Sequence, residues 1–178
     1  YNCSPAGNVT VTQAEKLPSQ EARIRRIKSV ALKNLQNTKR IMFFNKAHGI
    51  ALYRFASQLI PLATHEITDG WPWWEDTEIA AELKNIGSLI KKNDFKVSTH
   101  SPQVCVLNSP DPHGFQWVEK YLDYHNRLLD LMGLDDTAKI VFHVGGGYGD
   151  LDKSLEQAAA NYNHLSPELR RRIVLEND

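Results

Sequence analysis

The sequence predicts an α/β fold in which helices cover a parallel sheet. Short apolar segments typical of buried strands begin near residues 50, 95, 138 and 172. Their spacing is roughly 35 to 45 residues, and segments with apolar residues at helical spacing lie between them. This alternation indicates a parallel sheet, because two parallel neighbours need a crossover connection, which is usually a helix.

The first predicted elements are a long helix and a short strand. Residues 19–48 predict the helix, because apolar residues recur at helical spacing and Gly49 favours its end. The stripe consists of Ile24, Ile27, Ala31, Leu35 and Ile41. Residues 50–56 predict the first strand. Residues 57–74, rich in Pro, Gly and Trp, predict a long loop, and we expect Trp71, Trp73 and Trp74 to pack on the core.

Three further helix–strand units complete the pattern. Residues 76–92 predict a helix capped by Asp76 or Thr77, and residues 95–100 predict the second strand. The remaining predicted elements are a loop over 101–113, a helix over 114–132, a strand over 138–144, the loop GGGYGD over 145–150, a helix over 152–161 and a last strand over 171–178.

The composition excludes several classes of protein. Lys+Arg and Asp+Glu are both 21, which does not predict a nucleic-acid binder but leaves room for a local basic patch. The segments ARIRRIK and RRRI predict solvated helix surface. Cys3 and Cys105 show no disulfide spacing, and Cys105 predicts a small apolar core residue. No apolar run approaches the roughly 18 residues that span a bilayer, and no signal peptide is evident. We expect a cytoplasmic chain with no membrane partner.

Three of the four predicted strands end in a side chain that can bind a metal: His100, His143 and Glu176. In parallel α/β folds the functional groups gather at the carboxyl ends of the strands. Two imidazoles and a carboxylate there predict a transition-metal site with mixed nitrogen and oxygen ligands. A single histidine at a strand end is more often structural, so the prediction depends on all three. His65, in the loop after the first strand, is a fourth candidate that lies farther out.

The other polar motifs are weaker. We expect His48, His113, His125 and His164 to be surface residues of helices or loops. The GGGYGD loop does not match a dinucleotide-binding fingerprint, because its sixth position is Asp150, and it lacks the Lys-Ser/Thr of a P-loop. It predicts a tight turn whose backbone amides can meet a phosphate.

Several strings together resemble the ultraviolet damage endonuclease family. They are NLQNTKRIMFFNKAHGIALYRFASQLIPLATH, STHSPQ, MGLDDTAKIVFHVGGGYGD and VLEND, and the resemblance runs from NCSP to the last residue. It implies a TIM-type (β/α) barrel, here a single partial barrel domain over residues 1–178 with about four parallel strands. It also implies a cluster of divalent metals, usually manganese, and nicking of DNA immediately 5′ to a photoproduct.

The resemblance implies a role for individual residues. His100 and His143 match metal ligands and Glu176 matches a metal-bridging carboxylate, so these three are also the catalytic candidates. His65 matches a residue near the DNA-facing groove, and Gln103 matches one of two residues that probe damaged double-stranded DNA. We also assign Val104 and Tyr148 to DNA binding. The chain departs from the family in two ways: Val104 stands where an aromatic or bulky residue is usual, and His100-Ser101-Pro102-Gln103 replaces the commoner H-P-x-Q.

The resemblance covers roughly the first half to two thirds of the family enzyme. We therefore expect the chain to be a piece of a barrel that is monomeric when complete, and acts at the bacterial nucleoid. Two alternatives remain open from the sequence. One is a sugar isomerase or epimerase of the xylose-isomerase-like barrel plan, and the other is a barrel fragment without catalytic activity.

Overall fold

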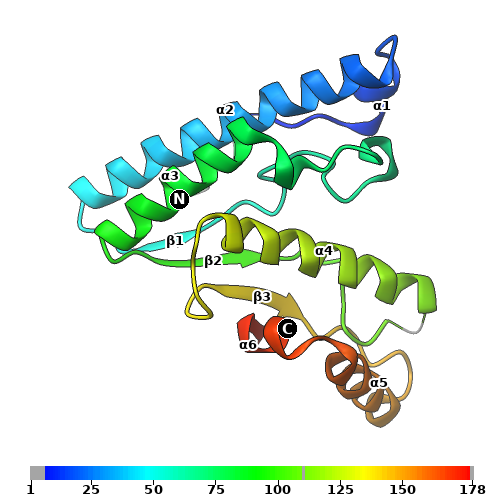
Figure 1. Ribbon diagram of the computed structural model, residues 1–178. Helices are drawn as coiled ribbons and strands as arrows, with labels where there is room; N and C mark the ends of the chain where they lie inside the picture. The colour runs from blue at the N-terminus through cyan, green and yellow to red at the C-terminus, as the bar shows by residue number, and fades with distance from the viewer. Residues whose placement is uncertain (1–6, 110, 177–178) are drawn as a thin grey trace.

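The computed structural model describes residues 7–109 and 111–176. Its centre is a parallel sheet of four strands, the first three of which are labelled in Figure 1. The strands are β1 (Leu52–Arg54), β2 (Lys96–His100), β3 (Lys139–His143) and β4 (Ile173–Glu176). Their order in the sheet follows the sequence, and each neighbouring pair is parallel. The predicted α/β class and parallel sheet are confirmed.

Helices connect the strands and pack over the sheet, and α2 and α3 lie side by side (Figure 1). The helices are α1 (Val11–Glu15), α2 (Gln20–Ala47), α3 (Thr77–Lys92), α4 (Pro112–Leu131), α5 (Leu151–His164) and α6 (Pro167–Arg172), with 3-10 turns η1 (Glu66–Thr68) and η2 (Trp73–Glu75). None of those helices has both the length and the apolar character needed to cross a bilayer.

The predicted boundaries of the first and last strands need correction. The first strand is shorter than residues 50–56, although the Phe55 amide still donates to the Ser98 carbonyl at 2.8 Å. Arg171 and Arg172 belong to α6 rather than to the last strand, because Ser166 caps a short helix with Pro167 in its first turn. The predicted strand residues 177–178 lie outside the described residues. Helix α1, which has a capping box, was not predicted.

The core lies between the sheet and the α3–α4 pair. Ile140 and Phe142 of β3 are fully buried, and Trp73 packs edge-on against Tyr124 of α4, as expected for that loop tryptophan. Cys105 is buried, as predicted, and burial raises the pKa of its thiol to about 11. Helices α3 and α4 approach so closely at Gly87 that a Cβ there would lie 1.8 Å from the Met132 carbonyl oxygen. Only glycine permits this contact.

Arg172 contradicts the prediction that the RRRI segment is solvated surface. Its side chain is 6% exposed and donates to the Asn126 side-chain oxygen at 2.6 Å and to the Leu134 carbonyl at 2.6 Å. It also forms an ion pair with Asp130 at 2.7 Å. The guanidinium therefore ties the start of β4 to α4 and to the segment after it, because its fork of donors can reach several acceptors at once.

Replacing this arginine should destabilise the protein far more than replacing its neighbour. We expect Arg172→Met to lower the free energy of unfolding by about 2 to 4 kcal/mol, because buried acceptors lose their donor. Arg171→Met is the matched control, since Arg171 is exposed and its Nε lies 3.8 Å from Asp136. Its effect should stay below about 1 kcal/mol. Denaturant unfolding measures both, and equal losses would contradict the structural role of Arg172.

Candidate metal centre at the strand ends

The candidate site lies where three neighbouring strands end. His100, His143 and Glu176 are the last residues of β2, β3 and β4. In the sheet register His143 pairs with Glu176, and His100 pairs with Val141. Val141 is two residues before His143, and alternate residues of a strand point to the same face. The register therefore places all three side chains on one face and at one end of the sheet.

The three side chains also meet in space. The Nε2 atom of His100 lies 2.7 Å from Oε2 of Glu176, and the rings of His100 and His143 have their centroids 4.9 Å apart at 80°. One ligand atom from each residue lies within 4.8 Å of the others. Two imidazole nitrogens and a carboxylate oxygen suit a transition metal such as manganese or zinc. The donor set therefore fits a divalent metal ion.

Burial differs across the site in a way that suits a ligand cluster open on one side. His143 is only 4% exposed, whereas the side chains of His100 and Glu176 are 21% and 40% exposed. The hydrogen bond between the His100 ring and the Glu176 carboxylate fixes the orientation of that ring. The buried histidine thus forms the floor of the site, and the carboxylate lies at its open side.

Hydrogen bonds hold the loop after β2 to the end of β3 and to the loop that follows β3. The Leu107 amide donates to the His143 carbonyl at 3.2 Å, and the Asn108 side chain donates to the Gly146 carbonyl at 2.6 Å. A Cβ on Gly145 would lie 1.9 Å from Oδ1 of Asn108, and Gly145 has φ +107°. The GGGYGD segment is a tight turn, as predicted, and its first glycine is required by this close approach.

The DNA-binding candidates lie on the loops rather than in the cluster. Gln103 and Val104 follow β2 and are exposed, with Val104 at 87%. Tyr148 follows β3, is 57% exposed and has φ +43°, a left-handed conformation that is rare for a tyrosine. These side chains flank the strand ends from two loops.

His65 lies in a different hollow, of about 310 Å³, between its own loop and α4. Trp74 and Arg127 also line this hollow, and the Arg127 guanidinium stacks 4.3 Å from the centre of the Trp74 ring. The Nδ1 atom of His65 accepts from the Ile67 amide at 3.1 Å, which leaves Nε2 as the ring nitrogen free to donate. The DNA-binding candidates predicted from the sequence therefore lie in two separate places: the loops after β2 and β3, and the hollow beside α4.

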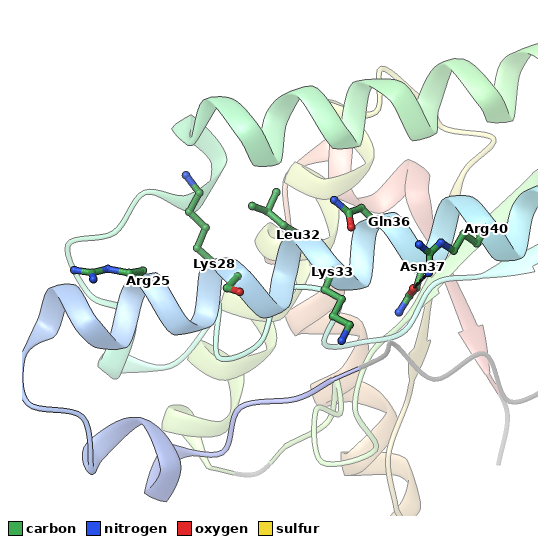
Figure 2. A pocket seen from close by; sticks show the side chains of 8 residues that line it. Arg25, Lys28, Leu32, Lys33, Gln36, Asn37 and Arg40 are labelled. Carbon is green, nitrogen blue, oxygen red and sulfur yellow. Dashed lines mark hydrogen bonds between the residues drawn. The ribbon is translucent and has the colours of Figure 1, made fainter.

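Another hollow, of about 510 Å³, runs along one face of α2 (Figure 2). All of its lining residues come from that helix, and four of them are basic: Arg25, Lys28, Lys33 and Arg40. Lys28 is paired with Asp76 at 2.8 Å. None of the three strand-end residues lines this hollow, so it is not part of the candidate metal centre.

His125 was expected on the surface, and the structure shows that this is wrong. It lies in α4 in the same stripe as Leu122 and Leu129, and all three are fully buried. Burial, together with a smaller contribution from the nearby charge of His100, lowers the pKa of His125 to about 3. The signal was present in the sequence, because the spacings of three and four residues to those leucines place His125 on the apolar face.

This buried histidine should make stability depend on pH. An unfolded chain protonates His125 near its ordinary pKa of about 6.5, whereas the folded chain resists protonation down to about pH 3. Between these values the unfolded state binds the extra proton, so the free energy of unfolding falls as pH falls. We expect His125 to contribute a loss of about 2 kcal/mol from pH 7 to pH 5.

Denaturant unfolding of His125→Leu at both pH values measures this contribution. The variant should lose about 2 kcal/mol less than the parent between pH 7 and pH 5. His164→Leu is the matched control, because His164 lies exposed on α5 and its variant should keep the parental pH dependence. An unchanged pH dependence in His125→Leu would mean that His125 is not held neutral in the folded chain.

Comparison with known proteins places this geometry in a family. The family model described as UV-endonuclease UvdE matches residues 1–178. A UV DNA damage endonuclease of Bacillus mycoides (strain KBAB4) is 37% identical over 179 residues, which are 100% of this chain and 55% of that protein. One from Bacillus cereus (strain Q1) is 37% identical over 184 residues, with the same shares.

A solved structure shares the fold over almost the whole chain. It is described as "Crystal Structure of SacUVDE", has a TM-score of 0.85 and 32% sequence identity, and the match covers 99% of this chain and 57% of that one. This match confirms the predicted class, a part of a TIM-barrel-like fold. The chain spans about half the length of the curated relatives it matches, as the resemblance implied.

Proposed function

Because the chain belongs to the UV-endonuclease UvdE family, we propose that it takes part in nicking DNA 5′ to ultraviolet photoproducts by metal-dependent hydrolysis. The observation that carries the proposal is the convergence of His100, His143 and Glu176 at one end of the parallel sheet. Two curated relatives carry the name UV DNA damage endonuclease, which supports a nuclease over the sugar isomerase. Since the chain spans about half of those relatives, the proposed activity belongs to the whole protein.

In this proposal His100 and His143 would hold the metal through ring nitrogens, and Glu176, which matches the family's metal-bridging carboxylate, would hold it through its carboxylate. The cofactor is proposed to be Mn²⁺, because mixed nitrogen and oxygen donors suit it. When bound, the metal supplies charge neutralisation at the phosphate and an acidified water as nucleophile. The protein residues contribute fixed donors: the buried His143 restricts the position of the ion, and Glu176 lies nearer to solvent.

Recognition of damaged double-stranded DNA is proposed for the loops around this centre. The exposed side chains of Gln103, Val104 and Tyr148 extend from the loops after β2 and β3, where a duplex could reach the strand ends. His65 can donate from Nε2 to a phosphate farther along the duplex. Photoproducts distort and unstack DNA, so these contacts would sense deformability rather than base edges. We propose that the complete protein acts as a monomer on the chromosome in the bacterial cytoplasm.

Metal affinity tests the ligand assignment directly. We expect His143→Ala to weaken Mn²⁺ binding at least tenfold, because the ion loses a buried first ligand that its neighbours cannot replace. Titration followed by electron paramagnetic resonance measures free Mn²⁺, and circular dichroism shows that the variant remains folded. His164→Ala removes an exposed histidine from α5 and should leave the affinity unchanged. Equal Mn²⁺ affinity in the parent and His143→Ala would remove His143 from the site.

Nicking of supercoiled plasmid tests the proposed reaction. The substrates are irradiated and unirradiated plasmid, each with Mn²⁺ or with chelator, and the enzyme is this chain beside a curated relative of full length. We expect the full-length protein to nick only irradiated plasmid with metal present, and its variant at the position of His143 to lose the activity. Metal-independent nicking, or equal nicking of undamaged plasmid, would contradict a metal-dependent damage endonuclease.

A further inference from the structure

Two buried hydroxyl groups flank His100 on the opposite face of its strand. Thr99 is fully buried and Ser101 is 1% exposed. The Ser101 amide donates to the Val141 carbonyl at 3.1 Å, so the ladder between β2 and β3 continues past His100. Since side chains alternate along a strand, Thr99 and Ser101 point away from the metal centre and into the layer of helices. Neither side-chain oxygen has a hydrogen-bond partner among the described residues.

His125 faces the same layer from α4. It lies in a stripe with Val118, Leu122 and Leu129, all fully buried, and neither of its ring nitrogens bonds to a residue that the structure describes. The neighbouring Tyr124 holds this part of α4 against the loop after β1, because its hydroxyl accepts from the Ile60 amide at 3.0 Å. Helix α4 packs against β3, which is the neighbour of β2 in the sheet, so His125 and the two hydroxyl groups lie in the same interior layer.

Hydrogen-bond chemistry favours a shared partner for these groups. Buried side-chain nitrogen and oxygen atoms are nearly always hydrogen-bonded, to protein or to ordered water. A neutral imidazole offers one donor and one acceptor, and each hydroxyl offers both. A buried water makes about three hydrogen bonds, which the two hydroxyls and the imidazole can supply. A direct bond among the three is absent from the described part of the chain.

We propose that Thr99, Ser101 and His125 hold at least one internal water molecule between β2 and α4, and that His125 thereby acts as a positioning residue for His100. The water links α4 to the two residues on either side of His100. A shift of that strand end would alter the 2.7 Å contact between His100 and Glu176, on which the geometry of the metal centre depends. The positioning role rests on the proposed metal binding, whereas the water site does not.

The water site is tested by nuclear magnetic resonance of the chain without metal. Nuclear Overhauser effects between a long-lived water and the His125 ring protons are expected in the parent. They should weaken in Thr99→Val, which keeps the shape of the side chain and removes its hydroxyl. Nitrogen-15 shifts should show a neutral ring with one bonded donor and one bonded acceptor. Absence of the water signal, or a ring bonded directly to Thr99 or Ser101, would overturn the water site.

The positioning role is tested by Co²⁺ affinity, read from the visible spectrum of the bound ion. We expect His125→Leu to weaken Co²⁺ binding about tenfold in a variant that remains folded, as for other residues that orient a ligand. His125→Asn, which keeps a donor and an acceptor, should restore most of the affinity. Thr99→Val should weaken binding about threefold, and it decides the question if His125→Leu does not fold.

The Co²⁺ test has a matched control variant, and defined results would contradict the positioning role. His113→Leu changes an exposed histidine of the same helix and should leave Co²⁺ affinity unchanged. Parental affinity in His125→Leu, or in Thr99→Val, would overturn the positioning role. Strictly additive losses of Co²⁺ affinity in the double variant of His125→Leu and Thr99→Val would also overturn it, because groups that share one water are coupled. If the parent binds no Co²⁺ at all, the proposed function fails together with the positioning role, and the water signal alone decides the internal site.

Discussion

The register of the parallel sheet is the constraint on which the candidate site depends. His143 pairs with Glu176, and His100 lies one strand away opposite Val141. A slip of one residue in either pairing would turn a ligand to the opposite face, because the side-chain period of a strand is two. The register is fixed from the other side of the sheet, where Ile140 and Phe142 are fully buried against the helices. Packing on one face thus positions the chemistry on the other.

Because one face of the sheet is partly exposed and the other is buried against helices, polar groups on the two faces find their hydrogen-bond partners in different ways. On the ligand side, His100 and Glu176 are partly exposed and satisfy each other at 2.7 Å. On the helix side, Thr99 and His125 are buried where water from bulk cannot reach them. A polar group left alone there costs free energy, so a structured partner is required. Arg172 is a buried polar side chain whose donors are satisfied by several acceptors of the protein.

The sequence alone predicts the parts that follow from periodicity. The apolar segments predict where the strands end, and the residues at those ends are His100, His143 and Glu176. The errors concern residues whose environment contradicts their usual preference. Arginine is mostly exposed and histidine is intermediate, so Arg172 and His125 were expected on the surface, although both lie at buried positions. The burial of Arg172 depends on long-range neighbours such as Asn126 and Leu134, which local patterns do not contain. The burial of His125 could have been predicted from its place on the apolar stripe of its helix.

Diffraction from a crystal of the chain grown with Mn²⁺, recorded at the manganese absorption edge, tests the central claim most directly. The account predicts an anomalous peak among His100, His143 and Glu176, with a ring nitrogen of each histidine and a carboxylate oxygen bound to it. The contact of 2.7 Å between His100 and Glu176 should then be replaced by contacts of both residues to the ion. A crystal in which manganese binds elsewhere, with the His100–Glu176 hydrogen bond intact, would contradict the assignment of this centre.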